Sequence, residues 1–162
     1  MSAQEAPGGA AAVCLGTPYR GDDAAGPLVE ELLRADGVPV LSCDHEPTRL
    51  LDQWTGLGLV VIVDAVRSGA AAGTVHRIET RDEALPRDLG LASSHAFGVA
   101  DALELAHTLG RAPARVVVYG IEGEAFGMGD PVTPAVRAAV ATVAAAAAGE
   151  LREALAQCTS SI

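Results

Sequence analysis

No lysine occurs in this 162-residue chain, so all eleven of its basic residues are arginine. Aspartate and glutamate together number 21, which leaves a formal net charge of -10 at pH 7. Proteins that bind nucleic acids need clustered basic residues to contact the phosphate backbone. The charge balance therefore argues against nucleic acid as a partner.

Aromatic residues make up only 3% of the chain, although 49% of it is hydrophobic. Alanine, valine and leucine must therefore fill the core of what we expect to be a single domain. The three cysteines, Cys14, Cys43 and Cys158, follow no recognisable spacing, so no disulfide framework is expected. Cys14 is predicted to pack in the core and Cys158 to lie in a frayed tail.

Neither end of the sequence has a clear targeting or membrane signal. The stretch "MSAQEAPGGA" lacks the basic and apolar regions of a signal peptide. The alanine-rich run "AAVATVAAAAAG" is too short to cross a bilayer. We therefore expect a soluble, cytoplasmic protein with flexible tails at 1–10 and 158–162 and one folded domain at 11–157.

Apolar runs alternate with segments of helical periodicity along most of the chain. The predicted strands are 11–17, 38–44, 59–66, 73–79 and 114–122, and the predicted helices are 26–37, 47–57, 93–110 and 133–157. The strand at 73–79 follows its predecessor too closely for a helical crossover, so it is expected to run antiparallel. This order predicts an α/β fold, a three-layer α/β/α sandwich around a mostly parallel five-stranded sheet.

Acidic residues and histidines follow several of the predicted strands, where open α/β sheets form their sites. Asp22 and Asp23 follow the first strand, Asp64 ends the third, and His95 begins a later helix. Cys43, Asp44, His45 and Glu46 follow the second strand, and Glu122 and Glu124 follow the last. Two carboxylates and one imidazole form a ligand set suited to first-row divalent metals.

Other chemistries fit this pattern less well. A phosphoryl-accepting receiver domain would need a lysine after the last strand, and the chain has none. Ser93 and Ser94 are more simply helix caps, because no nucleophile elbow surrounds them. Cys43 with His45 lacks a supporting thiol motif, and His76 and His107 are expected to be surface or hydrogen-bonded residues.

Four blocks of sequence together resemble the nickel-iron hydrogenase maturation endopeptidases. They are "GTPYRGDDAAG", "VVIVDAVRSGAAAGTVHRIE", "SSHAFGVADALELAHTLG" and "VVVYGIEGEAFGMGDPVTPAV", and they cover most of residues 13 to 140. The resemblance implies an α/β/α sandwich with a twisted five-stranded sheet. It also implies an endopeptidase that removes a C-terminal extension from the hydrogenase large-subunit precursor after nickel insertion.

The resemblance further implies that Asp23, Asp64 and His95 bind a metal and carry the catalysis. That metal is nickel supplied by the precursor, although the free protein could hold another divalent ion. Asp22 is then expected to support the turn or to cap the following helix. The family usually has Asn where Thr17 stands and Gly where Ala24 stands, and Ala24 is expected to restrict the turn.

Two mechanisms remain open at this stage. The nickel could polarise water or the scissile carbonyl, or it could only position the substrate while a carboxylate such as Asp64 acts as general base. A non-catalytic metal-binding accessory protein for hydrogenase assembly is the alternative function. The resemblance also suggests a monomer that meets the precursor transiently.

Overall fold

The computed structural model describes residues 8–42, 47–81, 90–92 and 95–160, with the backbone alone at 47–48 and 95–98. Its centre is a five-stranded sheet in the order β2-β1-β3-β5-β4. The strands are β1 (Ala10–Cys14), β2 (Val40–Leu41), β3 (Leu59–Val66), β4 (Val75–Thr80) and β5 (Arg115–Glu122). All neighbours pair in parallel except β4, which pairs antiparallel with β5 at the edge. The expected antiparallel edge strand is confirmed.

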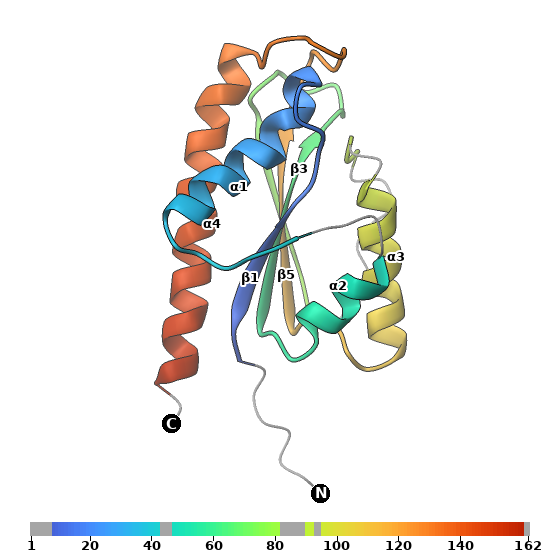
Figure 1. Ribbon diagram of the computed structural model, residues 1–162, viewed down its shortest axis with the longest axis vertical. Helices are drawn as coiled ribbons and strands as arrows, with labels where there is room; N and C mark the ends of the chain where they lie inside the picture. Colours follow the sequence, from blue (N-terminus) through green and yellow to red (C-terminus); the bar gives the residue numbers. More distant parts are fainter. Residues whose placement is uncertain (1–7, 43–46, 82–89, 93–94, 161–162) are drawn as a thin grey trace, which may run out of the picture.

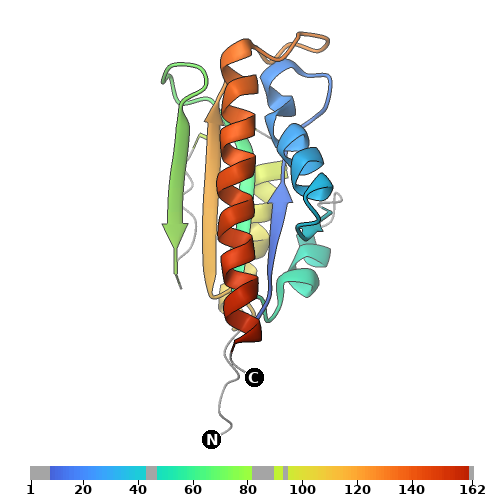
Figure 2. The same cartoon turned by 90° about the vertical axis from the view of Figure 1, so that its left-hand side faces the viewer.

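Helices cover both faces of this sheet. Helices α1 (Ala25–Ala35) and α4 (Pro134–Thr159) lie on one face, and α2 (Pro47–Trp54) and α3 (His95–Thr108) lie on the other (Figure 1). Turned by 90°, the molecule shows α4 running along the strands with β4 at one edge (Figure 2). The predicted three-layer sandwich is confirmed.

The two central strands are buried along almost their whole length. Every residue of β3 is buried, and in β5 only Arg115 is partly exposed. Their sequences, "LVVIVDAV" and "RVVVYGIE", are apolar on both faces because helices cover both sides. By contrast, β4 alternates exposed and partly covered residues as an edge strand does.

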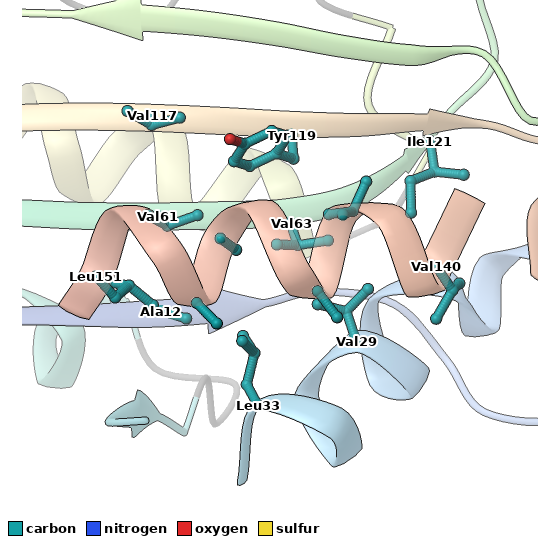
Figure 3. Packing of buried hydrophobic residues seen from close by; sticks show 14 of the residues in the cluster. Ala12, Val29, Leu33, Val61, Val63, Val117, Tyr119, Ile121, Val140 and Leu151 are labelled. Atoms are coloured by element: carbon teal, nitrogen blue, oxygen red, sulfur yellow. The ribbon is translucent and has the colours of Figure 1, made fainter. Parts of the chain in front are cut away.

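Small side chains fill the core in place of aromatic ones. Figure 3 shows α4 laid against the sheet through residues such as Val140 and Leu151, with Val29 and Leu33 of α1 beside it. Trp54 is the largest fully buried side chain and packs on the opposite face. The alanines of α4 allow the helix to lie close to the strands.

Several boundaries differ from the predicted ones. β2 has only two residues, and a 3-10 turn, η1 (Gly21–Ala24), precedes α1. Helix α1 ends where Gly37, at φ 73°, allows the chain to turn, as expected for a helix stop. Helix α4 extends to Thr159, so exposed Cys158 lies on a helix and not in a tail.

The alanine-rich run was predicted to be too short to cross a bilayer, but the helix that contains it, α4, is long enough. The helix has 26 residues and an apolar composition that would suffice to cross a bilayer. Eight of its side chains are nevertheless buried within the sandwich, for example Val136, Val143 and Leu151. Core helices of soluble proteins have these same properties, and α4 packs here as a core helix.

Candidate active site

The site lies at the carboxyl ends of the parallel strands, at the top of Figure 1. The loop after β1 is tied to β3 by a 2.8 Å hydrogen bond from the Leu15 amide to the Val63 carbonyl. Its glycines allow close packing: a Cβ on Gly21 would lie 2.2 Å from the Ala125 carbonyl oxygen. A Cβ on Gly26 would lie 1.8 Å from the Leu15 carbonyl oxygen. A larger residue at Gly21 would push this loop away from the segment after β5, and one at Gly26 would push α1 away from Leu15.

Asp22 is fully buried, and donors surround its carboxylate. Backbone amides of Glu124, Ala125 and Thr133 donate to it at 2.9, 3.1 and 2.8 Å, and the Thr133 hydroxyl lies 3.1 Å from both oxygens. Burial raises the pKa of Asp22, but these hydrogen bonds outweigh burial and hold the pKa below its ordinary value. Thr133 is the N-cap residue of α4. Asp22 therefore supports the turn, as predicted, but it holds the start of α4 and does not cap α1.

Asp23 is also buried, but few hydrogen-bond donors surround its carboxylate. It is 3% exposed, and its Oδ2 accepts one hydrogen bond, from the Thr17 amide at 2.9 Å. Its Oδ1 is buried and has no hydrogen-bond partner among the residues that the structure describes. Buried polar atoms are seldom left unpaired, so this oxygen is suited to a ligand or a cation.

The two departures from the family pattern leave this loop intact. Thr17 contacts Asp23 through its backbone amide, which any residue at that position supplies. Ala24 has φ -73°, within the range of any residue, so the expected restriction of the turn by its side chain is wrong.

Asp64 lies inside β3, two residues before the strand ends, and is fully buried. Its Oδ1 accepts a hydrogen bond from the Ala65 amide at 2.8 Å. The 3-10 turn η1 contacts β3, so the loop that bears Asp23 packs on the strand that bears Asp64. The side chain of His95, at the start of α3, lies outside the described residues.

Metal ligation by Asp23, Asp64 and His95 therefore stays a prediction. Within the described ranges, no group of three or more His, Cys, Asp or Glu side chains is arranged to hold a metal ion. The unpaired Oδ1 of Asp23 is nevertheless a suitable oxygen donor for a divalent cation. The candidates Cys43, Asp44, His45, Glu46, Ser93 and Ser94 also fall outside the described residues.

Glu122, expected at the rim, is instead a buried structural residue at the end of β5. The Ser68 amide at 2.9 Å, the Ser68 hydroxyl and the Ala70 amide at 3.2 Å all donate to its carboxylate, and His76 Nε2 lies 3.5 Å away. Burial raises the pKa of Glu122, but these donors outweigh burial and keep the pKa below its ordinary value. Glu122 thus fixes the loop between β3 and β4.

Among the described residues, His76, His107, Cys14 and Cys158 are not part of the lining of the site around Asp23. His76 Nε2 lies 3.5 Å from a Glu122 carboxylate oxygen, but it is buried and has no hydrogen-bond partner among the described residues, so the predicted hydrogen-bonded histidine is not confirmed. His107 Nε2 is buried without a hydrogen-bond partner among the described residues, which the sequence did not predict. Burial raises the pKa of the Cys14 thiol to about 12, so this cysteine is inert, in line with its predicted place in the core.

A cavity of about 300 Å³ opens beside Asp23. The described residues that line it are Arg20, Asp23, Arg67, Gly90, Leu91, Ala92 and Phe126. Sequence reasoning missed the two arginines and Phe126, since it considered only acidic residues, histidines, cysteines and serines at the strand ends. Arg67 directly follows β3, so including cations in that survey would have found it.

One of the comparisons with known proteins identifies a family. The family model described as "Hydrogenase maturation protease" matches residues 28–150. A search of curated proteins finds no match to this chain.

Solved structures share the fold. The hydrogenase maturating endopeptidase HybD from E. coli has a TM-score of 0.74 and 23% identity, covering 90% of this chain and 93% of that chain. HybD from Thermococcus kodakarensis has a TM-score of 0.72 and 24% identity, covering 86% of this chain and 96% of that chain. The protease HycI from Thermococcus kodakarensis KOD1 has a TM-score of 0.67 and 20% identity, covering 89% of this chain and 92% of that chain.

The family match spans most of the chain and includes β3, β4, β5 and most of the helical layers. Members of this family are peptidases, so the non-catalytic accessory alternative loses its support. A receiver domain is excluded on the same ground. This chain belongs to the hydrogenase maturation protease family and is a hydrolase of peptide bonds.

Proposed function

We propose that this protein removes the C-terminal extension of a nickel-iron hydrogenase large-subunit precursor after nickel has been inserted. The precursor brings the nickel, which is therefore part of the substrate. Asp23, Asp64 and His95 recognise it together. The reaction takes place in the cytoplasm between a monomeric protease and a precursor that binds transiently.

One observation carries this proposal beyond the family assignment. Asp23 places a buried carboxylate oxygen without a described hydrogen-bond partner beside a cavity at the carboxyl ends of the strands. Leaving a carboxylate oxygen unpaired in a buried position is costly unless a cation compensates for it. A divalent ion carried by the substrate would supply that compensation, and only the loaded precursor would then bind well.

The three residues differ in what they can contribute. Asp23 lies on a loop held rigidly by its glycines and by the neighbouring Asp22. Asp64 is fixed in a central strand, so its position is preorganised. His95 begins α3 and would complete an N/O ligand set.

Two routes to hydrolysis fit this arrangement. In one, the substrate's nickel supplies Lewis acidity toward water or the scissile carbonyl. In the other, the nickel positions the peptide and the Asp64 carboxylate removes a proton from the attacking water. Both need the negative charge of Asp64, so the variant Asp64→Asn tests the shared requirement.

The test is the intact mass of the precursor before and after incubation with the protein. We expect loss of a C-terminal peptide from nickel-loaded precursor, no loss from nickel-free precursor, and at least a hundredfold slower loss with Asp64→Asn. Thermal unfolding of Asp64→Asn serves as the control for folding.

Two outcomes would overturn the proposal. Equal cleavage of loaded and nickel-free precursor would remove nickel recognition from the function. Nickel-dependent binding of the precursor without any cleavage would restore the accessory role in place of the protease.

A further inference from the structure

Two arginines line the cavity beside Asp23, although the protein as a whole is acidic. The two guanidinium groups come from two segments far apart in sequence. Arg20 lies in the loop after β1, and Arg67 lies directly after β3. Both are exposed, and both face the same 300 Å³ cavity.

Phe126 holds the two arginines in place through uncharged groups. The Arg20 Nε donates to the Phe126 carbonyl oxygen at 3.1 Å. The Arg67 guanidinium carbon lies 4.1 Å from the centroid of the Phe126 ring, a cation-π contact. Neither contact neutralises the guanidinium charge, and each leaves N–H donors of its arginine available.

Most other arginines in the described part of the chain are neutralised by carboxylates. Ion pairs with Asp or Glu involve Arg34, Arg77, Arg81, Arg111, Arg115 and Arg152. Among the described residues, no carboxylate lies within ion-pair distance of Arg20, Arg67 or the distant Arg137 on α4. Arg20 and Arg67, which have no described acidic partner, therefore line one cavity.

An anion is the ligand that satisfies such an arrangement. The planar guanidinium donates two parallel hydrogen bonds to a carboxylate, which makes the pair both strong and directional. Asp23 borders the same cavity, so its lining contains both cationic and acidic groups. A peptide that carries both a metal ion and a carboxylate would match both kinds of group.

We propose that Arg20 and Arg67 bind a carboxylate of the substrate peptide and so hold it against Asp23. This inference rests on the proposed function, because it assigns the peptide part of the same substrate. The carboxylate is either an acidic side chain or the free C-terminus of the extension. Arg20 and Arg67 are substrate-binding residues, and they leave the chemical step to the carboxylate and imidazole groups.

The experiment measures steady-state cleavage of nickel-loaded precursor by the wild type and by Arg20→Gln, Arg67→Gln and Arg67→Lys. Arg137→Gln is the matched control, because it removes the same charge from an arginine outside the cavity. We expect Arg20→Gln and Arg67→Gln each to raise KM about tenfold, with kcat within about twofold. Arg67→Lys should recover part of the loss, because it keeps the charge without the planar fork.

Substrate variants identify the carboxylate. One precursor has the acidic side chains of its extension replaced by amides, and a second has its C-terminal carboxylate amidated. With one of these two precursors, the KM of the wild type should rise about tenfold. With that same precursor, Arg67→Gln should cause no further rise in KM. A purely structural role for Arg67 would instead give the same loss on every substrate.

The two proposals fail in different ways. If the wild type cleaves the precursor and both glutamine variants match Arg137→Gln, the carboxylate site is wrong and the protease function stands. If the wild type leaves the precursor uncut whether or not it carries nickel, the proposed function is wrong, and the inference falls with it.

Discussion

Asp22 and Asp23 are adjacent in the sequence and almost equally buried, at 0% and 3% exposed. The Asp22 carboxylate accepts hydrogen bonds from three backbone amides and a hydroxyl. The Asp23 carboxylate accepts one, and one of its oxygens has no described partner. Burial alone therefore does not distinguish these two carboxylates, whereas the number of hydrogen-bond donors around each one does.

Glu122 belongs with Asp22 in this comparison. Its donors fix the loop after β3, just as the donors to Asp22 fix the start of α4. Both residues have a pKa below the ordinary value because hydrogen bonds outweigh burial. The acidic rim thus divides into carboxylates that hold the site together and at least one that is available to a ligand.

The largest expected effect is on activity, from Asp23→Asn. The asparagine oxygen can still accept from the Thr17 amide, while its NH₂ group takes the place of the unpaired oxygen. The negative charge is lost, so cleavage of nickel-loaded precursor should fall at least a hundredfold. The free energy of unfolding should change by less than about 1 kcal/mol, since no buried donor loses its acceptor. A stable variant with full activity would remove Asp23 from the site.

Asp22→Asn should give the reverse result. An amide has one acceptor oxygen where the carboxylate has two, so at least one buried amide of Glu124, Ala125 or Thr133 would face an NH₂ group. We expect a loss of about 3 kcal/mol in the free energy of unfolding. Thermal or denaturant unfolding measures this loss directly. If Asp22→Asn proved as stable as Asp23→Asn, the comparison between the two residues would fail.

A smaller effect is expected from Glu122 on acidification. Its pKa in the folded protein lies below the ordinary value of 4.5, so the charged form stabilises the fold. This contribution is complete above about pH 4.5 and is lost as the pH falls toward the pKa of the folded protein. Wild type and Glu122→Gln should therefore differ most in stability near neutral pH and converge below pH 4.5.

Denaturant unfolding at a series of pH values measures the Glu122 effect. His76 faces Glu122, so the variant His76→Gln separates the contribution of the histidine. A difference between wild type and Glu122→Gln that grew on acidification would contradict the assignment.

The central fold could be predicted because its strands follow simple patterns. "LVVIVDAV" is apolar throughout and became β3, and the short connection to 73–79 required an antiparallel edge strand. The second strand was predicted over 38–44, and in the part that the structure describes, 38–42, only Val40 and Leu41 form a strand. Only Ala12 and Val13 of β1 pair with it at this sheet edge, so tertiary pairing, which the sequence does not display, limited it.

The positions of the acidic residues at the strand ends could be predicted, but their contacts could not. The strand ends located Asp22, Asp23 and Asp64, because parallel strands end at one edge. The partners of Asp22 lie more than 100 residues along the chain, so no local pattern could assign it to α4. The pocket of Arg20, Arg67 and Phe126 likewise depends on contacts across the whole fold.

The large sequence separation between Asp22 and its hydrogen-bond donors also has a consequence for the order of folding. All its donors follow β5, 102 to 111 residues later in the chain, so its hydrogen bonds form only when the segment before α4 docks. Closing such a long loop is entropically costly, so we expect these contacts to form after the transition state. The Asp22 carboxylate therefore stabilises the fold only late in folding. Removing it should raise the unfolding rate far more than it lowers the folding rate. The half of the site that holds Asp23 would thus be completed among the last steps of folding.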